Sequence, residues 1–154
     1  MHDPGGVRIV ALSTGDIERM ENMLAMFGEA FGEVETYSGA RPSPAYLRKL
    51  LGSEHFIALA AVRGAEVVGG LAAYELRKFE QERSEIYIYD LAVAAAHRRQ
   101  GIATALIEQL RTIAAERGAY VLFVQADPVD APAVALYSKL GIREDVLHFD
   151  IAVR

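Results

Sequence analysis

The chain has 154 residues, a length that suits one domain, and its 52% hydrophobic and 24% charged residues exclude a disordered chain. We therefore expect a single domain over residues 1–154. Sixteen Lys and Arg against 21 Asp and Glu give a net charge of −5, which argues against nucleic-acid binding as the main task and permits a cationic partner.

The N-terminal third predicts one strand and two helices. Branched residues over 7–12 are typical of a strand. Apolar side chains spaced three and four residues apart predict a helix over 17–31, and Gly32 ends it. Residues 33–44, rich in Gly, Pro, Ser and acid, predict a mobile loop before a short helix through Tyr46.

The middle of the chain predicts three strands. Residues 55–62 and 66–76 are apolar segments separated by a turn containing Gly64, which is the pattern of an antiparallel hairpin. Residues 84–93 are rich in Ile and Tyr and predict a third strand, which carries an unusual charge at Asp90.

The C-terminal part of the chain predicts two helices and two strands. These are a helix over 101–117 ended by Gly118, a strand over 120–125, a helix from Asp130 to Gly141 and a last strand over 146–153. The predicted order β-α-α-β-β-β-α-β-α-β indicates an α/β protein.

Several kinds of chemistry are excluded by composition. The absence of cysteine removes disulfides, thiolate metal sites and a cysteine acyl-enzyme. Four histidines, His2, His55, His97 and His148, lack the spacing of metal ligands, so we expect no metal. The apolar runs are too short for a membrane span and the N-terminus has no apolar signal region, so we expect a cytoplasmic protein.

The most informative segment is LAVAAAHRRQGIATAL, residues 91–106, where a strand passes through a basic turn into a helix. Gly101 and Ala103 lack bulk, so a pyrophosphate can approach the unpaired amides of the first helical turn. Arg98, Arg99 and His97 add positive charge. The alternative is a solvated loop in which Gly101 only ends the preceding segment.

These residues resemble the GNAT superfamily of acetyl-CoA-dependent N-acyltransferases. Arg98, Gly101 and Ala103 match its R/Q-x-x-G-x-G/A pyrophosphate loop. Five residues match its second motif, N-x-x-A-x-x-L-Y-x-K-x-G-F: Ala133, Leu136, Tyr137, Lys139 and Gly141. Asp130 replaces the usual Asn and Ile142 the usual Phe. The resemblance implies a central, mostly antiparallel mixed sheet, splayed between its fourth and fifth strands and flanked by helices.

A narrower resemblance covers most of the chain. The segments KFEQERSEIYIYDLAV, FIALAA, VQAD, PAVALY and HFDI look like those of the type I aminoglycoside 3-N-acetyltransferases. This implies acetyl transfer from acetyl-CoA to an amine of a gentamicin-like aminoglycoside, with antibiotic resistance as the outcome, and we expect a homodimer. Pro128 and Val129 stand where that branch has an acidic, glycine-containing stretch, so part of the acceptor contact differs.

The resemblance also assigns roles to residues. Val93 would offer a backbone N–H to the thioester oxygen, and Tyr137 would protonate the departing CoA thiolate, although a packed core tyrosine is the alternative. The residues expected to contact acetyl-CoA are Leu91, Ala92, Val93, Arg98, Arg99, Gln100, Gly101, Ile102, Ala103, Thr104, Asp130, Ala133 and Tyr137.

The general base stays open among three carboxylates because Tyr87 stands where many GNAT members carry a Glu. Strand alternation puts Glu85 on one face with Tyr87 and places Asp90 on the opposite face. We favour Asp127 and Asp90 over Glu85, and a buried structural carboxylate is the alternative for Asp90. A polycationic acceptor predicts a pocket lined by acids, with Glu80, Glu85, Tyr87, Asp127 and Asp150 as substrate-binding candidates.

Two other functions fit the same motifs. One is a GNAT enzyme for another small amine, a polyamine or a protein N-terminus. The other is a regulator that binds acyl-CoA without turnover.

Overall fold

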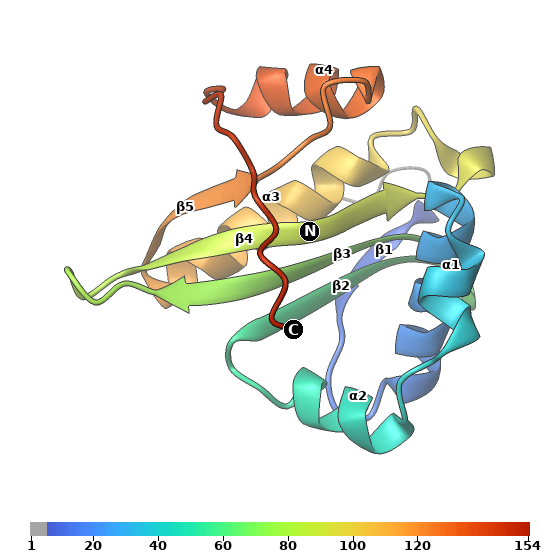
Figure 1. Ribbon diagram of the computed structural model, residues 1–154. Coiled ribbons are helices and arrows are strands. Elements are labelled where there is room, and N and C mark those ends of the chain that lie inside the picture. Colours follow the sequence, from blue (N-terminus) through green and yellow to red (C-terminus); the bar gives the residue numbers. More distant parts are fainter. Residues whose placement is uncertain (1–5) are drawn as a thin grey trace. The chain divides into compact units, whose positions relative to one another are not determined.

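The structure is a computed structural model that describes residues 6–154. The chain divides into two units, residues 1–124 and 125–154, which are described separately. The first unit contains β1 (Arg8–Ala11), α1 (Ile17–Phe31), the π-helical turn η2 (Glu35–Gly39), α2 (Pro44–Leu51), β2 (Phe56–Arg63), β3 (Glu66–Arg77), β4 (Ser84–Val93), the short 3-10 turn η3 (Ala95–His97), α3 (Ile102–Arg117) and β5 (Ala119–Val124) (Figure 1). Within residues 6–154, no helix is long and apolar enough to cross a membrane.

The five strands form one mixed sheet in the order β1-β2-β3-β4-β5. The first four pair antiparallel, while β4 and β5 run parallel. Pairing with β5 runs from Ser84 to Ile88, so the last five residues of β4 continue beyond it. The predicted mixed, splayed sheet is confirmed, and this open end of β4 lies directly before the basic turn.

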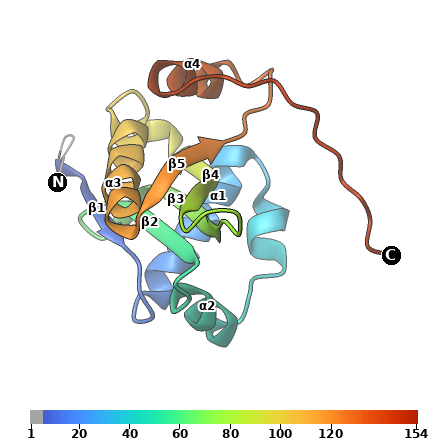
Figure 2. The same ribbon diagram turned by 90° about the vertical axis from the view of Figure 1, so that its left-hand side faces the viewer.

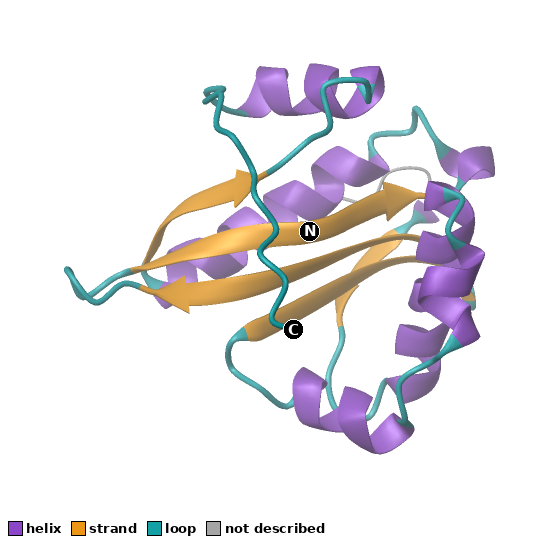
Figure 3. Ribbon diagram, in the orientation of Figure 1, coloured by secondary structure: helices purple, strands orange, loops and turns teal. Residues whose placement is uncertain are grey.

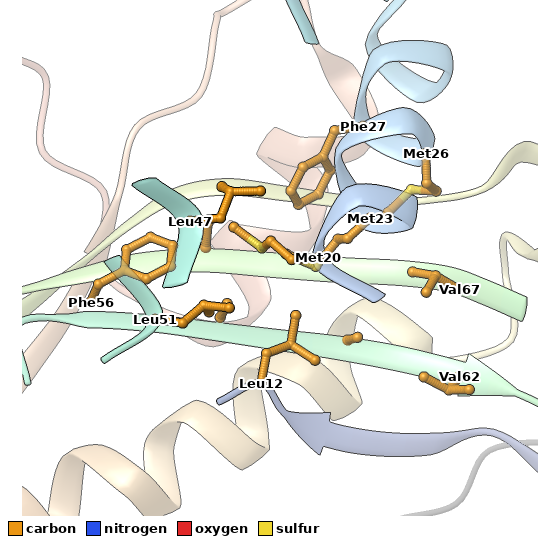
Figure 4. Close-up of a cluster of buried hydrophobic side chains, with 13 residues drawn as sticks. Leu12, Met20, Met23, Met26, Phe27, Leu47, Leu51, Phe56, Val62 and Val67 are labelled. Atoms are coloured by element: carbon orange, nitrogen blue, oxygen red, sulfur yellow. The ribbon is translucent and has the colours of Figure 1, made fainter. Parts of the chain in front are cut away.

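Helices cover both faces of the sheet in this unit. Figure 2 shows α3 on one side, with α1 and α2 on the other. The core between the sheet and the latter two helices is apolar, with Met23 fully buried and Phe27 1% exposed (Figure 4). Burial of each such side chain contributes roughly 1.5–3 kcal/mol. This packing fixes α1 against the sheet and so locates the turn that follows it.

Helix α1 begins and ends where the sequence predicts. Gly32 adopts a left-handed conformation with φ of 68°, and its N–H reaches the carbonyl of Glu29, which ends the helix. The following segment differs from the expected irregular loop, because Glu35–Gly39 forms a π-helical turn. The N–H of Tyr37 in this turn donates at 3.2 Å to the carbonyl of Glu33, which precedes the turn.

A β-bulge in β4 changes the face on which Asp90 lies. Ala72 of β3 is opposite Asp90, but its neighbour Ala73 is opposite Ile88, so Tyr89 is an extra residue in β4. Asp90 therefore lies on the face that also carries Tyr87, toward α1. The sequence-based placement on the opposite face was wrong because it assumed unbroken alternation.

The second unit consists of α4 (Ala131–Leu140) and the segment after it. The Asp130 carboxylate accepts a hydrogen bond from the N–H of Ala133 at 3.3 Å and caps α4 as predicted. The predicted last strand over 146–153 was wrong, since this segment is irregular and exposed (Figure 3). A strand needs a neighbouring strand to pair with its backbone N–H and C=O groups. The side chains of this segment instead make local contacts, such as the 2.8 Å contact between His148 and Asp150.

Candidate active site

The open end of β4 presents a backbone amide at Val93. The N–H of Ala94 donates to the carbonyl of Val68 on β3 at 2.8 Å. Because backbone groups alternate in direction along a strand, the N–H of Val93 points away from β3, toward the side on which β5 pairing ended at Ile88. The carbonyl of Val93 faces the same side and accepts a hydrogen bond from Nε of Arg98 at 3.2 Å. Leu91 and Ala92 precede it on the stretch of β4 that pairs with β3 but not with β5.

The basic turn leads into α3 through a left-handed glycine. Gly101 has φ of 80° and caps α3 without a side-chain hydrogen bond. The amides of Ile102, Ala103 and Thr104 belong to the first turn, where helical N–H groups have no partner within the helix. A Cβ at Gly101 would meet nothing within 4 Å, so the space at this corner of the turn is open. Arg99 also has a positive φ, 63°, in the same turn.

Close packing under the turn fixes the start of α3. Ile102 is 1% exposed. A Cβ at Gly69 of β3 would lie 3.0 Å from the Cγ2 atom of Ile102, so the glycine allows α3 to approach the sheet. The first turn of α3 is therefore held at a set height above β3 and β4.

A side-chain network also ties the turn to the sheet. Arg63, the last residue of β2, donates from Nη2 to Oε1 of Gln100 at 3.0 Å, and its Nη1 lies 3.0 Å from Nδ1 of His97. Gln100 was predicted to contact acetyl-CoA directly, and the structure commits its carbonyl oxygen to Arg63. Sequence analysis missed Arg63 because its partners lie more than 30 residues away along the chain.

Asp90 lies on β4 just before the open amide. The hydroxyl of Tyr37 donates to Oδ2 of Asp90 at 3.1 Å. Burial raises the pKa of Asp90, and the Glu33 carboxylate raises it further, while the hydrogen bond from Tyr37 acts against both. A carboxyl with a raised pKa binds and releases protons closer to neutral pH than an exposed aspartate.

Aromatic rings surround the same face of β4. Tyr89 lies 5.9 Å from Tyr74 and 5.8 Å from Tyr87 in edge-on contacts, measured between ring centroids. Tyr87 also stacks on Phe123 of β5 at 4.7 Å. Tyr89 is 61% exposed, so this face combines a carboxylate with an accessible aromatic residue.

The predicted acids at the other end of β4 form a separate group. Glu85 is opposite Leu76, five residues from Asp90, or about 16 Å along an extended strand. Nζ of Lys78 lies 3.4 Å from Glu85 and 3.2 Å from Glu80, and the hydroxyl of Tyr120 donates to Glu85 at 3.1 Å. These two carboxylates already have a cationic partner, and the structure does not bring them to Asp90.

The second unit carries five of the predicted site residues. Asp127 is exposed and accepts a hydrogen bond from the N–H of Val129 at 3.2 Å. Burial raises the pKa of Tyr137 on α4, and the Asp130 carboxylate raises it further, so its hydroxyl keeps its proton at neutral pH. Ala133 donates to the Asp130 cap, and Asp150 is paired with His148.

Comparison with known proteins places this site in a family. Residues 20–142 match the acetyltransferase (GNAT) family, so the chain belongs to that family. Its members transfer acyl groups from acetyl-CoA, and the open β4 amide and the turn before α3 lie within the matched region.

Individual relatives narrow the comparison. An aminoglycoside acetyltransferase from an uncultured soil metagenomic sample is 65% identical, covering 96% of this chain and 99% of that chain with a TM-score of 0.95. A second, also from a soil metagenomic sample and solved in complex with sisomicin, is 30% identical over 99% of this chain and 100% of that chain, with a TM-score of 0.90. N-acetyltransferase 8B from Rattus norvegicus is 29% identical over 58% of this chain, and the match spans only 40% of that protein.

Proposed function

We propose that the protein transfers an acetyl group from acetyl-CoA to an amine of an aminoglycoside. The observation that carries this proposal is the strand β4, where the half-buried carboxylate of Asp90 precedes the outward-facing amide of Val93 by three residues. The 65% identity to an aminoglycoside acetyltransferase, over nearly the whole chain, supports the choice of acceptor. The net charge of −5 suits a polycationic acceptor.

The turn before α3 suits the pyrophosphate of acetyl-CoA. Free first-turn amides at residues 102–104, the open space at Gly101 and the guanidinium groups of Arg98 and Arg99 form a donor set for an anion. When bound, acetyl-CoA supplies the acetyl thioester. The N–H of Val93 would then donate to the thioester oxygen, an interaction worth about 3 kcal/mol in comparable sites.

Proton movements in the proposed reaction use two side chains. As the amine nitrogen bonds to the acetyl carbon and the carbon–sulfur bond breaks, a carboxylate takes the proton lost by the amine, and Tyr137 gives its phenolic proton to the sulfur. Asp90 and Asp127 are the candidates for the carboxylate. Tyr137 meets one requirement of a general acid, because its phenol holds its proton at neutral pH.

Within this proposal the acceptor is a gentamicin-like drug acetylated at its 3-amino group. The sisomicin-bound relative supports a drug of that chemistry. Acetylation removes a cation from the drug, and we propose resistance as the result. The cytoplasmic location and homodimeric state expected from the sequence stay predictions.

A panel of acceptors tests this proposal. Gentamicin, sisomicin, spermidine and an alanine-terminated peptide would each be mixed with acetyl-CoA, with CoA release followed and the acetylated nitrogen mapped by NMR. We expect turnover with the aminoglycosides at the 3-amino group. Turnover only with spermidine or the peptide would favour the other GNAT acceptors, and acetyl-CoA binding without any turnover would favour the regulator.

A further inference from the structure

We infer that Tyr37 is a positioning residue for the proposed acetyl transfer, holding the carboxylate of Asp90 in place as the base. The inference rests on the proposed function and deepens it, because it selects Asp90 over Asp127 and assigns a role to a residue outside both sequence motifs. It is carried by the 3.1 Å hydrogen bond between the Tyr37 hydroxyl and Oδ2 of Asp90, which joins two residues 53 positions apart.

Tyr37 is itself held by α1. Its ring lies 6.1 Å from Phe27 and 5.7 Å from Phe31, measured between centroids. A Cβ at Gly28 would meet the Cβ of Tyr37 at 3.2 Å, so glycine at this helical position lets the turn η2 lie close against α1. The hydroxyl is therefore aimed at Asp90 by a packed helix rather than by a free loop side chain.

The bulge at Tyr89 supplies the other half of this arrangement. If the same residues alternated without a bulge, Asp90 would face α3 and could not meet Tyr37 on the α1 side of the sheet. Asp90 lies three residues before Val93, about 10 Å along the strand. A proton taken from an amine at the thioester would therefore reach the carboxylate through bridging water molecules.

Charge in this region explains why Asp90 needs the hydroxyl. The ionisable groups that face it are Tyr37 and Glu33 from the turn after α1, Tyr74 from β3, and Tyr87 and Tyr89 from β4. Burial and Glu33 favour the protonated form of Asp90, which cannot act as a base. The hydrogen bond from Tyr37 favours the carboxylate and fixes its orientation.

The test compares Tyr37→Phe with Tyr120→Phe. Each variant removes one phenol that donates to a carboxylate at 3.1 Å, and the second carboxylate, Glu85, lies at the far end of β4. For Tyr37→Phe we expect kcat/KM for the aminoglycoside to fall about tenfold at pH 6 and less at pH 8, because loss of the hydrogen bond moves the acid limb of the profile to higher pH. Tyr120→Phe should leave that limb where it is in the wild type.

Two further measurements make the result decisive. In Tyr37→Phe, acetyl-CoA affinity should match the wild type and the melting temperature at pH 8 should fall by only a few degrees, because the folded protein loses one hydrogen bond to the carboxylate. The Asp90 carboxyl resonance, followed by NMR in the unliganded protein, should titrate at higher pH. If the wild type is active and the acid limb of the kcat/KM profile does not move in Tyr37→Phe, the inference is overturned. If the wild type acetylates no acceptor, the proposed function fails and with it the use of Asp90 as a base, while the carboxyl resonance still decides whether Tyr37 controls its ionisation.

Discussion

Arg63 at the end of β2 donates to Gln100 in the turn before α3, a 3.0 Å contact that joins the sheet to the proposed pyrophosphate site. The same guanidinium meets His97, so one side chain braces two points of the turn. We expect Arg63→Leu to weaken acetyl-CoA binding by about tenfold, since each lost hydrogen bond contributes about 1 kcal/mol. Isothermal titration would measure this. Arg111→Leu, which removes an exposed pair with Glu108, is the control, and equal affinities in the two variants would argue against bracing.

Gly101→Val should abolish acetyl-CoA binding. Valine at φ of 80° is strained by about 1–2 kcal/mol, and its methyl groups would occupy the open corner at the N-terminus of α3. Gly118→Val is a matched control, because Gly118 ends the same helix with φ of 75° and equally open surroundings. Both variants should lose similar stability, but only the first should lose affinity in a fluorescence titration. Wild-type affinity in folded Gly101→Val would contradict the assigned site.

Tyr137→Phe should lower kcat by about 100-fold while acetyl-CoA affinity stays near that of the wild type, because only the proton donor is removed. Pre-steady-state measurement of CoA release would show the loss in the chemical step. The exposed Tyr46 offers a Tyr→Phe control. Wild-type turnover in Tyr137→Phe would reduce this residue to packing.

Asp90→Asn should make the protein more stable at high pH. Because the folded protein raises the pKa of Asp90 above its unfolded value, the stability linked to this group is complete below the unfolded pKa and is lost as pH rises through the folded pKa. Asparagine cannot ionise and still accepts the bond from Tyr37. We expect a melting temperature about 2 °C above wild type at pH 8, allowing for solvent screening, with no difference near pH 3. A difference in melting temperature that grows as the pH falls would contradict this prediction.

Asp127→Asn should raise KM for the aminoglycoside more than it lowers kcat if Asp127 anchors a cation while Asp90 serves as the base. Acetyl-CoA binding should persist, and added salt should weaken the wild-type acceptor affinity. Steady-state kinetics at two ionic strengths checks both points. A large fall in kcat with unchanged KM would instead return the base to Asp127.

Local signals predicted most of the helices and strands. Helix α1 was predicted over its observed bounds because its apolar spacing and Gly32 lie within the segment itself. Strand β4 also begins and ends where its Ile and Tyr content indicated. The features that the sequence did not predict depend on residues far away along the chain. The bulge at Tyr89 is defined against Ala72 and Ala73 of β3, and the strand expected over 146–153 has the right composition but lacks paired backbone.

In the candidate site, too, features set by local sequence were predicted, and those set by distant contacts were not. The turn around Gly101 was predicted because a glycine after a basic run is visible in the sequence itself. Tyr37 lies in a segment whose composition indicated only a loop, and its hydrogen bond to Asp90 could not be inferred without the fold.

The bulge also means that β4 is one residue longer than its ladder with β3 requires. Deleting Tyr89 would join Ile88 to Asp90 in a continuous ladder and leave each later residue on its present face. Deleting Leu91 instead would turn Ala92 and Val93 over, exchanging which of their amides points to β3. Position 89 is thus where this strand can be shortened without reversing its open end. Deletion of the Tyr89 codon would therefore disturb the open end of β4 far less than deletion of the Leu91 codon.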